Sequence, residues 1–183
     1  MTETLTALTS SSERAAHTRL GEVTHIGVDL MSMSRLSRAL TRSPHLFRRL
    51  CTDQERADLC TPDHAGLVWA TLLWTSKEAA AKCLETGFWR AGVDWPDLEI
   101  QLTAIGPRAD SAVVKPHQSM LTHLRDRASS ECGVEVTVKP HHSAADVLAD
   151  DRLSGHFVIK NEMGICIMHR TCGQMMSRPN IEL

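Results

Sequence analysis

The chain has 183 residues, with 20 Lys and Arg against 22 Asp and Glu, and its formal charge is −2 at pH 7. This near-neutral charge and the scattered basic residues argue against a general nucleic-acid binder. No segment approaches the roughly 18 consecutive apolar residues of a membrane span, so we expect neither a nucleic acid nor a membrane among the partners.

Length and cysteine usage predict one domain in a reducing compartment. A domain of about 150 residues can bury roughly 70% of its unfolded surface, which is enough for a core of its own. Six cysteines stand at irregular spacing without a CxxC pair, which is typical of reduced thiols in a cytoplasmic protein. We interpret residues 1–21 as a mobile N-terminal extension, residues 22–170 as the domain and residues 171–183 as a C-terminal tail.

The first half of the predicted domain is mainly helical after one strand. The β-branched run EVTHIGVDLM predicts a strand that ends near Asp29. SMSRLSRALTRS then has apolar residues at helical spacing until Pro44, and TDQE, from Thr52 to Glu55, is the pattern of a capping box. Residues 63–84 predict one long helix whose apolar half, LVWATLLW, indicates deep burial.

The second half is rich in predicted strands. DLEIQLTAI alternates between apolar and polar residues, which predicts a half-buried strand with Glu99, Gln101 and Thr103 facing outward. The further candidates are the strands SAVVK (111–115), VEVTV (134–138), HFVIK (156–160) and GICIM (164–168), and an amphipathic helix over 117–132. The order of elements predicts a single α+β domain in which an antiparallel sheet packs against the long central helix.

The stretch WTSKEAAAK (74–82) places charges on the otherwise apolar long helix. Glu78 and Lys82 are four residues apart, so they share a face and could form an ordinary exposed ion pair. TSKE could instead cap a separate helix, just as Asp29 could cap the helix that follows the first strand. The third interpretation is a site in which Asp29 and Glu78 bind Mg²⁺ and Lys82 binds a phosphate.

These residues also carry a resemblance to a known family. GVDL with an arginine six residues after the aspartate, TDQE, and WTSKEAAAK followed by ETG occur in this order over residues 24–88. In this respect the chain resembles the phosphopantetheinyl transferases of the small holo-acyl-carrier-protein synthase type. The resemblance implies transfer of the 4′-phosphopantetheine arm of coenzyme A to a serine of an apo acyl or peptidyl carrier protein, with Mg²⁺ as cofactor.

The resemblance also implies roles for individual residues. Asp29 and Glu78 match the metal ligands, and Glu78 and Lys82 match the catalytic positions. Lys82 matches the lysine that binds the phosphate of coenzyme A, and Lys77 would support it at the same substrate-binding site. Arg35 matches an arginine that contacts the acidic recognition helix of the carrier protein. Members of the family form trimers, which implies a possible homotrimer here.

The chain departs from the family pattern at three places. Ser32 stands where members commonly have a glutamate, and Glu85 replaces the first glycine of GTG. The C-terminal strand signature has two candidates, Glu135 to His141 and His156 to Asn161. These departures leave two alternatives open. One is a catalytically inactive module of the same fold that binds carrier protein or coenzyme A, and the other is a related fold that performs a different reaction.

Overall fold

The structure, a computed structural model, describes residues 22–57, 64–85, 87–88, 92–103, 113–114 and 134–173. The predicted N-terminal extension, the predicted helix over 117–132 and residues 174–183 of the predicted tail lie outside these residues. No helix of the described part is long and apolar enough to cross a membrane.

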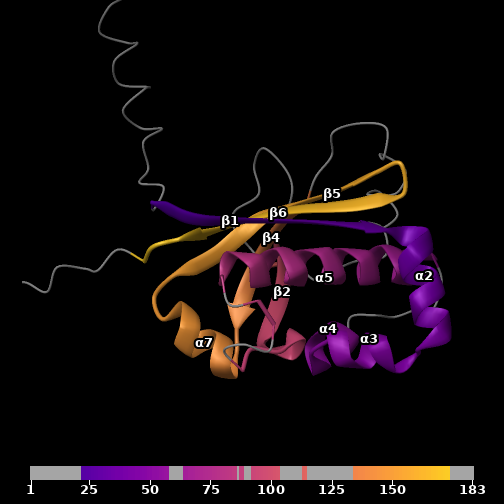
Figure 1. Ribbon diagram of the computed structural model, residues 1–183, viewed down its shortest axis with the longest axis horizontal. Coiled ribbons are helices and arrows are strands. Elements are labelled where there is room, and N and C mark those ends of the chain that lie inside the picture. Colours follow the sequence, from indigo (N-terminus) through magenta and orange to yellow (C-terminus); the bar gives the residue numbers. More distant parts are fainter. Residues whose placement is uncertain are drawn as a thin grey trace, which may run out of the picture.

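A six-stranded antiparallel sheet forms one layer of the molecule (Figure 1). Its strands are β1 (Val23–Ser32), β2 (Leu98–Thr103), β3 (Val113–Val114), β4 (Val134–Pro140), β5 (Arg152–Lys160) and β6 (Met163–Thr171). They lie in the order β1-β6-β5-β4-β2-β3, so the first strand of the chain pairs with the last one. The strands predicted from the sequence are therefore confirmed, and β6 extends to Thr171.

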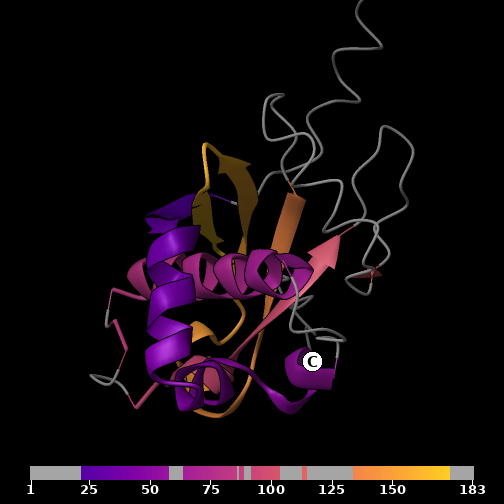
Figure 2. The same cartoon turned by 90° about the vertical axis from the view of Figure 1, so that its right-hand side faces the viewer.

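The helices lie on one side of the sheet and around its end (Figure 2). They are α2 (Met33–Arg42), α3 (His45–Leu50), α4 (Asp53–Ala57), α5 (His64–Cys83), the 3₁₀ helix η1 (Trp95–Asp97) and α7 (His142–Leu148). The long helix α5 packs against β1 and β6, and its apolar half supplies core residues such as Trp69 and Leu72. The predicted α+β class, with an antiparallel sheet on a long central helix, is confirmed.

Strand β1 has one face toward α5 and one toward solvent. Ile26, Val28 and Leu30 are exposed on the outer face, whereas Gly27 is buried and Asp29 is half-buried on the inner face. Because side chains alternate along a strand, this register directs Asp29 toward α5. The outer face of β1 is consequently an apolar surface that the described chain leaves open.

Candidate active site

Gly27 allows β1 and α5 to approach closely enough to form a shared site. A Cβ atom added at Gly27 would overlap the backbone carbonyl oxygen of Ala79 on α5. Only glycine permits this distance, and Asp29 follows two residues later on the same face of the strand. The glycine of the GVD motif therefore brings the aspartate to the helix that carries Glu78 and Lys82.

Lys82 and Asp29 form an ion pair between the helix and the strand. The Lys82 Nζ lies 2.8 Å from Asp29 Oδ1 and donates a second hydrogen bond of 2.7 Å to the carbonyl oxygen of Val28. The Lys82 side chain is 50% exposed and that of Asp29 is 17% exposed. The ammonium is thus held at the site but remains open to a ligand on its solvent side.

Glu78 lies half-buried beside this ion pair. Burial raises the pKa of its carboxyl group above the ordinary value, and the negative charge of Asp29 raises it further. The positive charge of Lys82 acts in the opposite direction. The buried Trp95 indole Nε1–H has no hydrogen-bond partner of good geometry among the described residues. The effect of the Asp29 charge on the Glu78 pKa is consistent with the metal-site interpretation, which stays a prediction.

The structure contradicts the alternatives that assigned these residues to helix capping. Helix α5 is continuous from His64 to Cys83, and the Thr75 hydroxyl donates to the carbonyl of Thr71 within it. TSKE is therefore not a helix start. Helix α2 is capped by Ser32, whose hydroxyl accepts from the backbone N–H of Arg35 at 3.4 Å. Ser32 rather than Asp29 is thus the capping residue.

The structure corrects the predicted substrate contact of Lys77. Its side chain is fully buried, and its Nζ lies 2.6 Å from Glu55 Oε2, which is also buried. Two backbone carbonyls, those of Leu50 and Trp95, accept the other hydrogen bonds of the ammonium at 2.7 and 3.0 Å. Because all three donors are occupied inside the core, Lys77 is a structural residue and not a substrate ligand in this fold.

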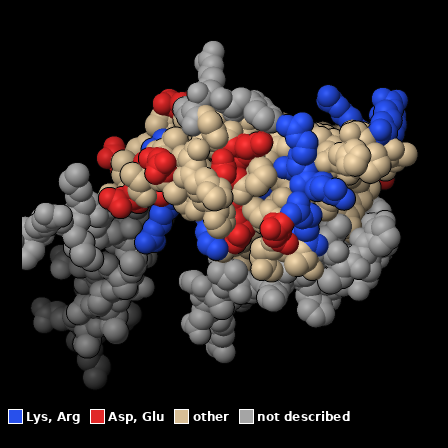
Figure 3. Space-filling model, turned by 90° about the horizontal axis from the view of Figure 1, so that it is seen from below, with Lys and Arg blue, Asp and Glu red and all other residues tan. Residues whose placement is uncertain are grey.

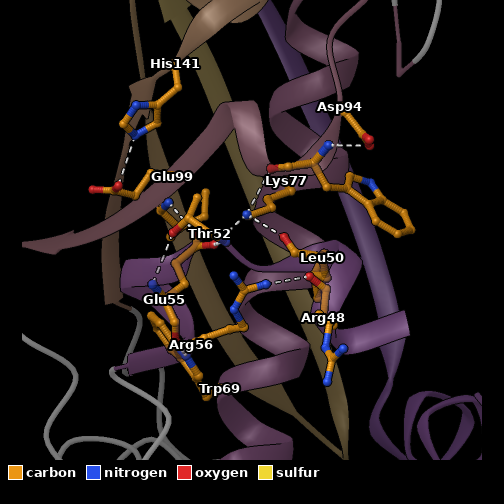
Figure 4. A network of polar contacts seen from close by, with 12 residues as sticks. Arg48, Leu50, Thr52, Glu55, Arg56, Trp69, Lys77, Asp94, Glu99 and His141 are labelled. Carbon is orange, nitrogen blue, oxygen red and sulfur yellow. Dashed lines mark hydrogen bonds and ion pairs between the residues drawn. The ribbon is translucent and has the colours of Figure 1, made fainter. Parts of the chain in front are cut away.

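Glu55 connects Lys77 to two further segments (Figure 4). Its carboxylate accepts from the backbone N–H of Thr52 at 2.7 Å and of Ile100 at 2.8 Å. The Glu55 N–H donates to the Thr52 hydroxyl at 3.1 Å, which completes the predicted capping box. A capping glutamate is usually exposed, so the sequence pattern found the cap but gave no sign of its buried partner.

Glu85 shows how the chain accommodates one departure from the family pattern. Its φ is 58°, in the left-handed region that glycine adopts without strain. His25 Nε2 on β1 lies 3.0 Å from Glu85 Oε1. The extra carboxylate therefore has a local partner in the imidazole of His25.

Two other candidate residues, Arg35 and His141, lie on different elements, at the start of α2 and before α7. Arg35 is exposed on the first turn of α2. His141 precedes α7 and its Nε2 lies 3.0 Å from Oε2 of Glu99. Glu99 was predicted to point to solvent, yet it is only 8% exposed. The alternating pattern of β2 could not indicate that His141 and Lys139, which follow much later in the chain, lie against this carboxylate.

Few side chains of the described part of the chain could bind a metal ion together. No group of three or more His, Cys, Asp or Glu side chains suited to a metal ion occurs among the described residues. The candidate site offers two carboxylates, and one Asp29 oxygen already contacts Lys82. Two carboxylates are what a Mg²⁺ ion commonly takes from a protein when water and substrate phosphate complete its shell.

Comparison with known families identifies the superfamily of this chain. A family model described as the 4′-phosphopantetheinyl transferase superfamily matches residues 25–129. This chain belongs to that superfamily. The matched part of this chain includes most of β1 and the helices α2 to α5. It therefore includes the candidate site residues Asp29, Arg35, Glu78 and Lys82.

Individual relatives and structures agree with the superfamily assignment. A holo-[acyl-carrier-protein] synthase of Verminephrobacter eiseniae is 30% identical over 124 residues, which is 68% of this chain and 91% of the relative. One from Moorella thermoacetica is 33% identical over 122 residues, 65% of this chain and 84% of the relative. The structure of the Helicobacter pylori enzyme in complex with coenzyme A has a TM-score of 0.54 at 16% identity, covering 80% of this chain and all of that one. The Plasmodium yoelii enzyme has the same TM-score at 12% identity, over 84% of this chain and 99% of its own. These structures share the fold.

Proposed function

We propose that the protein transfers the 4′-phosphopantetheine arm of coenzyme A to a serine of an apo acyl or peptidyl carrier protein. The observation that carries the proposal is the convergence of Asp29, Glu78 and Lys82 at the contact between β1 and α5. Membership of the superfamily supports it, because its relatives are named holo-[acyl-carrier-protein] synthases.

The two carboxylates suit a divalent cation. The pKa of Glu78 is raised first by burial and then by the charge of Asp29, so a bound cation would relieve repulsion that Lys82 offsets only in part. We infer that Asp29 and Glu78 hold Mg²⁺. When bound, this ion would neutralise charge on the diphosphate of coenzyme A and help to orient it.

Lys82 and Glu78 would act on the reacting groups. In the reaction the serine oxygen forms a bond to the phosphorus that carries pantetheine, and the P–O bond to adenosine 3′,5′-bisphosphate breaks. Lys82, exposed on one side, can bind the departing phosphate as a point charge or donate a proton to it. The serine proton needs an acceptor, and Glu78, half-buried beside Asp29 and Lys82, is a candidate carboxylate for it.

The carrier protein would bind to the basic surface of α2 and α3. No Asp or Glu occurs between Met33 and Leu50, whereas Arg35, Arg38 and Arg42 are all exposed. Figure 3 shows Lys and Arg gathered on the side of α2 and α3, with Asp and Glu more frequent toward the side of α7. Such a surface attracts an acidic partner and accelerates its association.

The outer face of the sheet supports self-association. Ile26, Leu30 and Ile167 are 66%, 57% and 51% exposed on adjacent strands β1 and β6. A contiguous apolar surface of this kind usually marks an interface, and we infer that further copies of the chain cover it, as in a homotrimer. A monomeric mass in light scattering at micromolar concentration would contradict this assembly.

The described cysteines Cys51, Cys83, Cys166 and Cys172 are free thiols. This supports the proposal of a reducing, cytoplasmic location.

The decisive test is a transfer assay. The protein is incubated with coenzyme A, Mg²⁺ and a panel of apo carrier proteins, and the added arm is detected by mass spectrometry. We expect Asp29→Asn and Glu78→Gln to lower transfer about a hundredfold or more, with Asp146→Asn, an exposed acid on α7, as the matched control. If no carrier is modified while coenzyme A or carrier binding persists, the protein is a binding module instead.

Arg35 provides a separate test of the carrier surface. Arg35→Glu should weaken carrier binding through charge reversal and leave the affinity for coenzyme A unchanged. An equal fall in both affinities would show that Arg35 is not a carrier-specific contact.

A further inference from the structure

Glu85 and His25 form a polar contact at the end of α5 that the proposed reaction does not use. Helix α5 ends at Cys83, and the backbone N–H of Glu85 donates to the carbonyl of Lys82 at 3.2 Å. His25 lies on the inner face of β1, as Asp29 does, and its Nε2 is 3.0 Å from Glu85 Oε1. The contact therefore lies about one helical turn beyond Lys82, the residue assigned to the phosphate.

The backbone at Glu85 favours glycine, the residue that the family pattern has at this position. The φ of 58° lies in the left-handed region, which glycine adopts freely and few other residues do. A glutamate therefore costs conformational free energy here that a glycine would not. Residues held in such conformations are concentrated at functional sites. The carboxylate is a property of this chain, and membership of the superfamily does not account for it.

Glu85 places negative charge beside a site for phosphates. Its side chain is 69% exposed and that of Lys82 is 50% exposed, so a ligand of Lys82 meets the field of both groups. The carbonyl groups at the C-terminus of a helix carry partial charge of the same sign as the carboxylate. Arg170, the register partner of His25 on β6, is already paired with Asp151 at 2.7 Å. This arginine therefore does not compensate Glu85.

His25 holds the carboxylate but has no exposed donor left for a phosphate. A carboxylate only accepts hydrogen bonds, so Nε2 of His25 carries the hydrogen between the two groups. The other ring nitrogen, Nδ1, is buried and has no hydrogen-bond partner among the described residues. The contact thus fixes the position of Glu85 and adds no further phosphate ligand.

The repulsion from such a carboxylate depends on the charge of the donor substrate. Coenzyme A carries a diphosphate and a 3′-phosphate, whereas dephospho-coenzyme A carries the diphosphate alone. Because the Coulomb energy is proportional to the product of the charges, a fixed carboxylate disfavours the more highly charged donor more strongly. Placing a like charge against one ligand is a general way in which a site distinguishes it from another.

We propose that Glu85 is a specificity-determining residue that lowers the preference of the site for coenzyme A over dephospho-coenzyme A. His25 is the positioning residue that holds its carboxylate. This inference rests on the proposed function, because it requires the phosphates of the donor to bind at Lys82.

The test is a calorimetric titration of the full-length protein with coenzyme A and, separately, with dephospho-coenzyme A, in saturating Mg²⁺ at pH 8. Histidine side chains are ordinarily neutral at this pH, so the measurement isolates the charge of Glu85. We expect Glu85→Gln and Glu85→Gly to tighten coenzyme A binding about threefold to tenfold and dephospho-coenzyme A binding less. Glu162→Gln is the matched control, since Glu162 is also exposed and has a φ of 59°. It should leave the ratio of the two affinities unchanged.

Two further measurements separate an effect of charge from an effect of structure. Higher ionic strength should reduce the difference between Glu85→Gln and the parent protein, because salt screens exposed charges. His25→Leu removes the N–H that fixes Glu85, so the affinity ratio should move part of the way toward that of Glu85→Gln. In the Glu85→Gln background the same change should have no further effect. An equal change in both backgrounds would show that His25 does not act through Glu85.

The inference is wrong if the Glu85 variants tighten both donors equally or neither, or if Glu162→Gln changes the ratio as much. A parent protein that binds neither donor refutes it together with the proposed reaction. The expected change in ratio without transfer to any carrier protein supports the role of Glu85 and refutes the reaction alone.

Discussion

Replacing Lys77 by methionine should destabilise the fold rather than abolish substrate binding. Methionine has similar length but no charge, so the buried Glu55 carboxylate would lose its cation while keeping the N–H groups of Thr52 and Ile100. The carbonyl oxygens of Leu50 and Trp95 would lose the donor that both of them share. The change therefore leaves one isolated charge inside the protein and removes a donor from two carbonyl groups, of which that of Trp95 keeps the N–H of Leu98.

The expected magnitude follows from the burial of this pair. Removing one partner of a buried ion pair costs about 3–5 kcal/mol, a large part of the roughly 5–15 kcal/mol that stabilises a typical domain. In a domain of this size each kcal/mol lowers Tm by about 2–4 °C, so Tm should fall by about 6–20 °C. Adding Glu55→Gln to Lys77→Met should restore part of the stability, because it removes the isolated charge, although the amide oxygen can replace only one of the two carboxylate oxygens that accept from Thr52 and Ile100.

Chemical denaturation at neutral pH, combined with the transfer assay on the folded fraction, measures this effect. Lys82→Met is the matched control on the same helix. Its side chain is 50% exposed, so stability should change by less than about 1 kcal/mol while transfer falls. The reasoning is refuted if Lys77→Met leaves stability within about 1 kcal/mol of the parent and removes coenzyme A binding. Lys77 would then contact the substrate after all.

Two further predictions concern the junction of β1 and α5. Gly27→Ala should lower both stability and transfer, because the added methyl group overlaps the Ala79 carbonyl; thermal unfolding checks this, and an unchanged Tm would contradict the close packing. Glu78 should titrate in ¹³C NMR above its usual pKa of 4.5, so its ionised, metal-competent form is gained as pH rises through that raised value. Asp29→Asn should lower this pKa, whereas an unaltered titration would show that the two carboxylates do not interact.

Patterns in the sequence predicted most elements because their apolar residues repeat with the period of the element. The alternation of β2 and the apolar half of α5 are determined by burial, which is visible locally. The position of Asp29 against the helix that carries Lys82 and Glu78 was predicted from chemistry and from family resemblance. No periodicity could give it, since it depends on the absence of a side chain at Gly27.

The two wrong predictions, a substrate contact for Lys77 and an exposed side chain for Glu99, have a common physical cause. Lys77 stands beside Glu78 in the motif, yet consecutive residues of a helix point in directions about 100° apart. One of them enters the core and the other faces the site. Glu99 was misplaced for a related reason, because its burial depends on His141 and Lys139, which lie about forty residues later. Charged residues enter a protein interior only when a distant partner compensates them, and a local pattern does not contain that partner.

The inward position of Lys77 affects how cellular experiments on this motif should be interpreted. A strain that carries a change at the first lysine of WTSKEAAAK would lack holo carrier protein, just as a strain without Glu78 would. In the first strain, however, the enzyme would be scarce, since a marginally folded chain is removed by proteases. Immunoblotting would separate depletion from inactivity, and raising expression should rescue only the lysine variant.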